Sequence, residues 1–148
     1  MPAQAPGPRR KCVLVVEDNA TVGGLLVALL REEGYRALRA WDGHEAIKMA
    51  RDRRPDLIVL DLSLPYRDGL EVLYELKGNE ETKSAPIVVV SGNTLQLSPE
   101  DQLLVTETVG KPFDIDRLMN VFRRALGDPE KEVPERDHDT SDAHLHSW

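Results

Sequence analysis

The 148-residue sequence lacks features that would place it in several common classes. Cys12 is the only cysteine, so no disulfide can form within the chain, and no CxxC or Cys/His pair suggests a redox or metal role. No apolar run approaches the roughly 18 residues of a membrane span, and the proline-rich start lacks the apolar middle of a signal peptide. We therefore expect a cytoplasmic protein without membrane contact, with Cys12 as a small buried hydrophobe.

Basic residues are fewer than acidic ones, 19 against 26. The formal net charge is −7, and residues 128–148 hold seven acidic residues against Lys131 and Arg136. The rest of the chain is only mildly acidic and has no basic stripe of the kind that binds a phosphate backbone. Nucleic acid is therefore not an expected direct ligand.

The composition fits one compact domain, which we place at residues 11–127. Hydrophobic residues make up 41% of the chain, enough for a core. Residues 1–10 hold three prolines among small residues, and residues 128–148 are polar and acidic, so both are predicted to be disordered tails. The tail histidines His138, His144 and His146 are interpreted as solvated side chains.

Within the domain, short apolar runs alternate with segments of helical periodicity. Cys12–Val16, Leu57–Leu60 and Ile87–Val90 are continuously apolar, which predicts strands covered on both faces of a parallel sheet. Tyr35–Ala40 is more mixed and suits an edge strand. The alternation indicates right-handed crossovers and a doubly wound α/β sheet.

Apolar residues at helical spacing predict the helices that join these strands. The first helix is expected to end at Gly34 in a left-handed conformation, and the last to begin at Asp114 as N-cap. Between Ser91 and Lys111, Pro99 and a weak apolar face predict a short or displaced helix, because proline is tolerated in a first turn but not in an interior. The clear apolar positions are Val22, Leu25, Leu26, Leu29, Leu30, Ala46, Ile47, Ala50, Leu70, Leu73, Leu76, Ile115, Leu118, Met119, Phe122 and Leu126.

Acidic side chains follow two of the buried runs. Glu17 and Asp18 come directly after the first run, and Asp61 follows Leu57–Leu60. A doubly wound sheet binds ligands outside the carboxyl ends of its strands, where the strand order reverses. If the first and third strands are neighbours there, the carboxylates meet, and their repulsion requires a cation or raised pKa values. Oxygen ligands favour Mg²⁺, and Lys111 is placed to counter the charge of a phosphoryl group.

With their neighbours, these residues resemble the receiver domain of two-component response regulators. The resemblance covers about residues 11–127 and implies a flavodoxin-like five-stranded parallel sheet with strand order 2-1-3-4-5. It also implies a stand-alone, chemotaxis-regulator-like signalling protein rather than an enzyme, whose only chemistry is phosphoryl uptake and release on its own aspartate. The matches, in the family's order, are Glu17-Asp18, Asp61-x-x-Leu64-Pro65-x-x-Asp68-Gly69, Ser91-Gly92 and Lys111-Pro112-Phe113.

The resemblance implies a role for each matched residue in the chemistry. Asp61 is the expected phosphoryl acceptor, and Lys111 would pair with the phosphoryl oxygens. Glu17, Asp18, Asp61 and the backbone carbonyl of Ser63 would hold Mg²⁺ or Mn²⁺. Ser63 also occupies one of the family's variable positions that tune hydrolysis.

Other matched positions concern switching. Ser91 matches a hydroxyl that turns toward the phosphoryl group, since phosphorylation adds charge and strong acceptors. Gly92 leaves room for that group, Asn93 occupies a second tuning position, and Lys111-Pro112 matches a cis peptide bond. Thr108 stands where the family often has an aromatic switch residue, so no large ring can swing at that position.

The resemblance implies a histidine kinase or a phosphotransfer protein as phosphoryl donor and a downstream protein as target, with a homodimer left open. A second hypothesis is a receiver-shaped binding module that works without phosphorylation, which Thr108 and the reduced fourth helix favour. A third is a Mg²⁺-dependent phosphohydrolase, but it would need a general acid two residues after Asp61, where the chain has Ser63.

Taken singly, several of these residues also have purely structural interpretations. Asp18 suits a helix cap or a solvated loop, Gly69 a positive φ, and Lys111 a surface charge. Only their ordered combination favours a site. Trp41 is expected to pack at the second strand and helix, and Trp148 to be exposed unless it docks.

Overall fold

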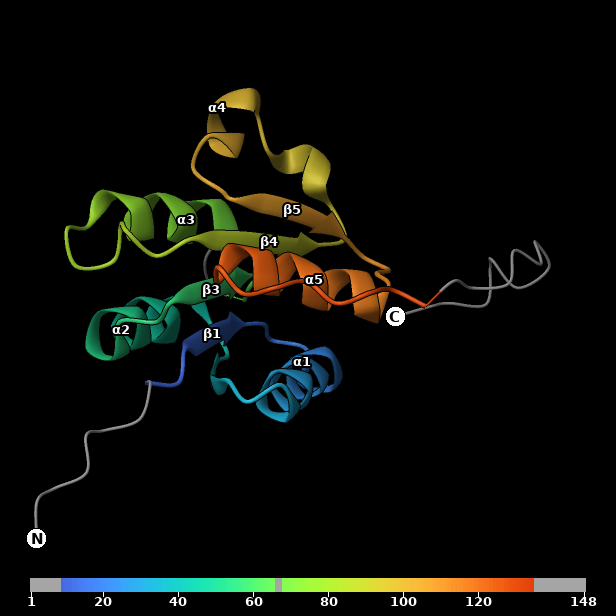
Figure 1. Ribbon diagram of the computed structural model, residues 1–148. Coiled ribbons are helices and arrows are strands. Elements are labelled where there is room, and N and C mark those ends of the chain that lie inside the picture. The colour runs from blue at the N-terminus through green and yellow to red at the C-terminus, as the bar shows by residue number, and fades with distance from the viewer. Residues whose placement is uncertain (1–8, 66–67, 135–148) are drawn as a thin grey trace, which may run out of the picture.

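The computed structural model describes residues 9–65 and 68–134, which form an α/β fold around one parallel sheet (Figure 1). The strands lie in the order β2-β1-β3-β4-β5, so the predicted doubly wound, five-stranded sheet is confirmed. The order reverses between β1 and β3, which places a ligand site at their carboxyl ends. The strands are β1 (Cys12–Val16), β2 (Arg36–Ala40), β3 (Leu57–Leu60), β4 (Ile87–Ser91) and β5 (Glu107–Gly110).

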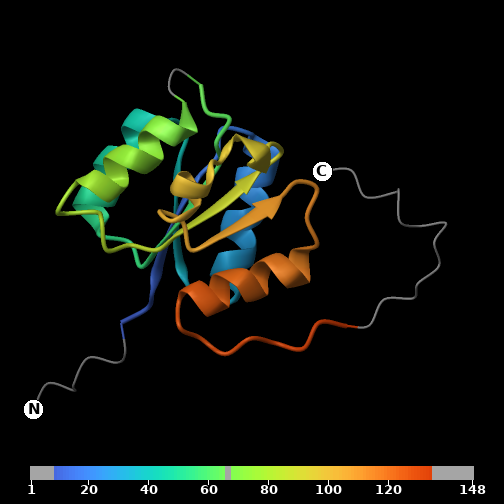
Figure 2. The ribbon, with the colours of Figure 1, turned by 90° about the horizontal axis from the view of Figure 1, so that it is seen from above.

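Helices cover both faces of this sheet (Figures 1 and 2). Helices α1 and α5 lie on one face, where they pack against Val13 and Val15 of β1, and α2 and α3 pack against Leu14 and Val16 on the other. Because successive residues of β1 enter opposite buried clusters, this strand must be apolar at every position. The helices are α1 (Ala20–Glu32), α2 (Gly43–Arg53), α3 (Gly69–Gly78), α4 (Pro99–Gln102) and α5 (Ile115–Ala125), with a 3₁₀ turn η1 (Thr94–Gln96).

Local sequence sets the helix ends. The side chains of Asn19, Asp42, Asp68 and Asp114 each accept a hydrogen bond from a backbone N–H in the first turn of the helix that follows. Gly34 follows α1 with φ of 95°, which confirms the predicted left-handed termination. The N-cap at Asp114 and the edge position of β2 are confirmed as well.

The segment between β4 and β5 is reduced, as Pro99 predicts. Helix α4 has 4 residues, Pro99 lies in its first turn, and Ser98 and Asp101 form a reciprocal capping box. This one-turn helix leaves the nearby surface uncovered: Thr108 of β5 is exposed, and Leu103 is 85% exposed. The edge of the sheet at β5 is therefore less covered than its centre.

After α5 the chain turns back along that helix (Figure 2). Asp128 accepts hydrogen bonds from Lys11 Nζ at 2.8 Å and from the Tyr35 hydroxyl at 2.6 Å. The amide of Asn120 donates to the carbonyl oxygen of Lys131 at 2.7 Å and accepts from its N–H at 2.8 Å. We call residues 128–131 the C-terminal strap. These bonds tie part of the predicted acidic tail to the domain.

The predicted domain limits of residues 11 and 127 remain predictions. Residues 1–8 and 135–148, with the three tail histidines and Trp148, lie outside the described residues. Cys12 is 2% exposed, as expected, and burial raises the pKa of its thiol. Trp41 contacts β2 through Arg39 but is 50% exposed, so its expected packing is only partial. In the part of the chain that the structure describes, no helix is long and apolar enough to cross a membrane.

Candidate functional site

The predicted acids meet at the carboxyl edge of the sheet. Glu17 and Asp18 follow β1, Asp61 follows the neighbouring β3, and the Asp61 N–H donates to the Val16 carbonyl at 3.0 Å. One carboxylate oxygen from each acid lies within 4.8 Å of the others. Glu17 and Asp61 are 3% and 5% exposed, whereas Asp18 is exposed. The predicted cluster therefore exists, and the ligand role of each acid remains a prediction.

Lys111 enters the same cluster from the end of β5. Its Nζ lies 2.5 Å from Glu17 Oε1 and 3.4 Å from Asp61 Oδ2, and its side chain is 17% exposed. The interpretation as an ordinary surface charge is therefore wrong. The Lys111–Pro112 peptide bond is cis, as the resemblance implied.

Burial and charge set the protonation of these groups. Burial raises the pKa of Glu17 to about 7, and neighbouring Asp61 adds to this effect, against the hydrogen bond from Lys111. Burial lowers the pKa of Lys111, but its hydrogen bond to Glu17 and the charge of Asp61 outweigh that effect and raise the pKa overall. Among the described residues, Lys111 is the cation that forms ion pairs with Glu17 and Asp61.

Backbone groups orient two of the carboxylates. Glu17 Oε2 accepts from the Asn19 N–H at 3.2 Å, and Asp61 Oδ1 accepts from the Ser63 N–H at 3.1 Å. The loop that carries Asp61 and Ser63 is held by Gly69, whose N–H donates to the Leu62 carbonyl at 3.0 Å. A Cβ on Gly69 would lie 2.4 Å from Leu62 Cα. Gly69 does not have a positive φ, so the structural interpretation of this glycine is wrong, and close backbone approach is its reason.

The predicted switch residues lie around the same edge. Ser91 ends β4 with 0% exposure, and its Oγ accepts from the Asn93 N–H at 3.4 Å. Gly92 and Asn93 are exposed, and a Cβ on Gly92 would meet no heavy atom of the described residues within 4 Å. Thr108 pairs with Val89 in the register of β4 and β5 and faces solvent. The switching roles of these residues remain predictions.

Sequence reasoning missed two residues that hold the acidic loop. Asn19 contributes its N–H to Glu17 and caps α1, and an asparagine directly before a helical pattern is a signal that could have identified it. Arg39 donates from Nε and Nη2 to the Glu17 carbonyl oxygen, at 3.2 and 3.0 Å. No local signal marks Arg39, because its contact depends on the pairing of β2 with β1.

The cluster suits a hard divalent cation. Its donors are carboxylate oxygens, two from buried residues and one from an exposed residue, and their combined charge exceeds that of Lys111. Mg²⁺ prefers oxygen ligands and keeps several waters, which the exposed side of the cluster leaves room for. Glu17, Asp18 and Asp61 are therefore the residues that could hold a metal here.

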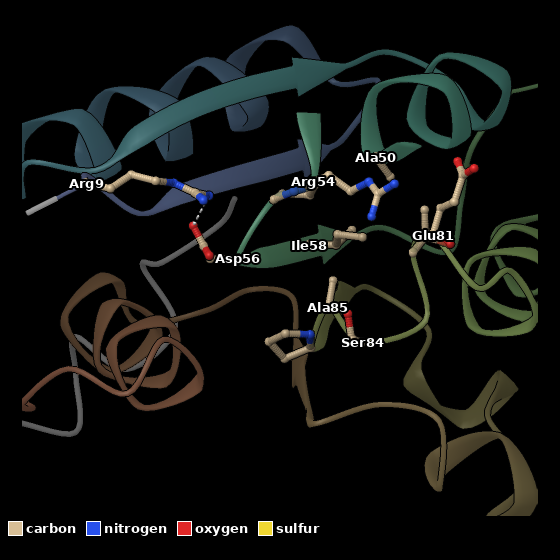
Figure 3. A pocket seen from close by; sticks show the side chains of 11 residues that line it. Arg9, Ala50, Arg54, Asp56, Ile58, Glu81, Ser84 and Ala85 are labelled. Carbon is tan, nitrogen blue, oxygen red and sulfur yellow. Dashed lines mark hydrogen bonds and ion pairs between the residues drawn. The ribbon is translucent and has the colours of Figure 1, made fainter. Parts of the chain in front are cut away.

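A separate hollow of about 410 Å³ lies near the amino ends of strands β3 and β4, at the other end of these strands from the acidic cluster (Figure 3). It is formed by the end of α2, the start of β3 and the loop between α3 and β4, and Arg9 and Asp56 form an ion pair of 3.3 Å in its lining. None of the predicted site residues lines it. The predicted site residues therefore lie away from this hollow.

Comparison with known proteins agrees with the fold. The response regulator receiver domain model matches residues 13–123. The polar-differentiation response regulator DivK of Brucella anthropi is 34% identical over 120 residues, covering 80% of this chain and 98% of DivK. DivK of Brucella ovis is also 34% identical over 120 residues, with the same coverage.

Solved structures give the same result. The receiver domain of sensor histidine kinase PA1611 from Pseudomonas aeruginosa, solved with a magnesium ion coordinated in its active-site cleft, is 31% identical with a TM-score of 0.72, covering 80% of this chain and 99% of that domain. Response regulator TrrA from Thermotoga maritima, solved with Mg²⁺-BeF, is 33% identical with a TM-score of 0.71, covering 78% and 99%.

The doubly wound sheet and its acidic edge define a receiver-type protein. The chain belongs to the response regulator receiver domain family of two-component signal transduction. Members of this family are generally signalling proteins rather than enzymes.

Proposed function

We propose that this protein is a phosphorylation-controlled switch. It accepts a phosphoryl group on Asp61 from a histidine kinase or a phosphotransfer protein, and the changed surface controls a protein target or passes the phosphate on. The observation that carries the proposal is the meeting of Asp61 with Glu17, Asp18 and Lys111 at the carboxyl edge of the sheet. Two similar receiver structures hold magnesium, one of them in its active-site cleft.

The chemistry follows from the groups around Asp61. A carboxylate oxygen of Asp61 attacks phosphorus, the bond from phosphorus to the donor's imidazole nitrogen or acyl oxygen breaks, and the donor leaves with that electron pair. Lys111, 3.4 Å from Asp61 Oδ2, offers its ammonium to the phosphoryl oxygens. The cation supplies charge neutralisation on those oxygens when bound. Glu17, Asp18, Asp61 and the Ser63 carbonyl would hold Mg²⁺ or Mn²⁺.

The switch starts at Ser91. Its hydroxyl is buried, and its oxygen accepts a long hydrogen bond of 3.4 Å from the Asn93 N–H. A phosphoryl group on Asp61 would add strong acceptors at this edge, which reward a rotation of the hydroxyl toward it. Movement of Ser91, Gly92 and Asn93 would then reach the one-turn α4 and the exposed surface of β5.

The proposal is tested by incubating the protein with Mg²⁺ and acetyl phosphate and measuring its intact mass. The wild type should gain one phosphoryl group, and Asp61→Asn should gain none. Asp68→Asn is the matched control, because Asp68 is an exposed acid of the same segment and asparagine also caps helices well. An unmodified wild type, or an adduct that survives in Asp61→Asn, would contradict the proposal.

A phosphorylation-independent binding module is the second candidate. The small exposed Thr108 and the 4-residue α4 favour it, because they offer few side chains that could transmit a change at Asp61 to the protein surface. Binding of a protein partner by wild type and Asp61→Ala under phosphorylating conditions separates the two candidates. Equal affinities favour the module, and a difference favours the switch. The phosphohydrolase hypothesis is tested by multiple turnover on phosphoesters.

A further inference from the structure

Arg39 of β2 holds the backbone of the acidic loop. Its Nε and Nη2 both donate to the carbonyl oxygen of Glu17, at 3.2 and 3.0 Å. The Glu17 N–H donates to the Ala40 carbonyl at 3.2 Å. Both backbone polar groups of Glu17 are therefore bound to β2, and the carboxylate faces Lys111 and the Asn19 N–H.

This contact fixes the direction of the next residue as well. The carbonyl that Arg39 binds belongs to the peptide group joining Glu17 to Asp18, and a peptide group is planar. Holding its oxygen therefore restricts the orientation of the peptide plane from which Asp18 starts. Asp18 is exposed, so burial does not hold its side chain. Its position beside Asp61 depends on this backbone geometry.

Two neighbours confine the Arg39 guanidinium. It stacks on the Trp41 ring, with Cζ 3.7 Å from the ring centroid. On α1, a Cβ added to Gly23 would lie 2.5 Å from Arg39 Nε and 2.7 Å from Cζ. Any side chain at position 23 would therefore displace the guanidinium. The adjacent Gly24 is exposed, and a Cβ there would meet no described atom within 4 Å.

We propose that Arg39 is a positioning residue for the metal and phosphoryl site. It orients the Glu17–Asp18 peptide so that both carboxylates face Asp61, and Gly23 and Trp41 form the slot that keeps the guanidinium in place. This inference rests on the proposed function, because it assigns Arg39 a role in the same site.

The test measures the Mg²⁺ dissociation constant by calorimetry, without a phosphodonor. Arg39→Gln should weaken binding by about tenfold, as loss of a group that orients a metal ligand does. Gly23→Ala should weaken it similarly, because the new Cβ displaces Arg39. Two variants serve as matched controls: Gly24→Ala changes a helical glycine with open space around it, and Arg36→Gln changes an exposed arginine of the same strand. The Mg²⁺ dissociation constants of both controls should stay within about twofold of the wild-type value, well short of the tenfold loss.

Further variants separate position from charge and from stability. Arg39→Lys keeps the charge but loses the planar fork and the stacking, so its Mg²⁺ binding should stay weak. Gly23→Ala combined with Arg39→Gln should bind no more weakly than Arg39→Gln alone, because both changes remove one contact. Saturating Mg²⁺ should restore the rate of phosphoryl uptake in Arg39→Gln. If Arg39→Gln fails to fold, Gly23→Ala against Gly24→Ala decides the question.

The outcomes distinguish this inference from the proposed function. If wild type binds Mg²⁺ and accepts phosphate while Arg39→Gln and Gly23→Ala bind Mg²⁺ equally well, the positioning role is overturned and the proposed function stands. Full rescue by Arg39→Lys also overturns it, since charge alone would then suffice. If wild type neither binds Mg²⁺ nor accepts phosphate, the proposed function itself fails.

Discussion

Ending the chain at Gly127 should destabilise the domain, because the C-terminal strap then disappears. Asn120 is 8% exposed and would lose both hydrogen bonds to the Lys131 backbone, each worth about 1 kcal/mol. Lys11 and Tyr35 would lose Asp128. The Lys11–Asp128 side chains are 39% and 30% exposed, so that pair adds only about 0.5 kcal/mol.

Freedom regained by the released strap offsets part of this loss. We expect a net decrease of about 2 kcal/mol in the free energy of unfolding, which corresponds to about 6–8 °C in Tm for a domain of this size. Thermal unfolding followed by far-ultraviolet circular dichroism should be measured on the full chain, residues 1–134 and residues 1–127. The 1–134 protein retains every one of these bonds and is the matched control.

The comparison also tests the predicted domain limit at residue 127. A lower Tm for 1–127 than for 1–134 places the strap within the folded domain. Equal Tm values for the two truncated proteins would refute the reasoning, since the strap bonds would then contribute nothing to stability.

Three further predictions concern single residues. Gly69→Ala should destabilise the protein by about 1–3 kcal/mol, because the new Cβ meets the Leu62 backbone. Gly78→Ala is the control and should be neutral or stabilising, since a Cβ there would meet no atom of the described residues within 4 Å. Equal denaturation midpoints for the two variants would contradict this prediction. Hydrogen bonds from Lys11 and Tyr35 lower the pKa of Asp128 in the folded protein. The stability that the Asp128 carboxylate contributes is therefore fully present above the pKa of the unfolded chain and is lost as the pH falls through the pKa of the folded state. The Tm difference between wild type and Asp128→Asn should therefore shrink on acidification from pH 6, and a constant difference would count against the contact. Lys111→Met should tighten Mg²⁺ binding, measured by calorimetry, because a competing cation is removed. It should slow phosphoryl uptake, measured by intact mass, at least about tenfold. Weaker Mg²⁺ binding or an unchanged rate of uptake would contradict this prediction.

The sheet could be predicted because each strand has a strong local signal. Residues of β1, β3 and β4 are buried on both faces, and only continuously apolar runs satisfy that requirement. Strand order came from the family resemblance rather than from these runs. The acids could be predicted because Glu17 and Asp61 directly follow neighbouring parallel strands, so the topology alone brings them together.

Other features had no local signal. Arg39 reaches Glu17 only through the register of β2 and β1, and Gly69 is required because the first residue of α3 lies against the Leu62 backbone in the loop after β3. The strap has the polar, proline-containing sequence of a disordered tail, yet Asn120 of α5 and Tyr35, directly before β2, bind it. Trp41 was expected to pack, but its ring stacks on a guanidinium and remains half exposed.

The proposed switch depends on where the phosphoryl group is attached. Borohydride reduces an aspartyl phosphate to homoserine, so treating the protein with acetyl phosphate and Mg²⁺, then reducing it and sequencing its peptides by mass spectrometry, locates the acceptor. We predict homoserine at position 61, absent when Mg²⁺ is chelated. Homoserine at another acid, or at none, would contradict the assignment of Asp61.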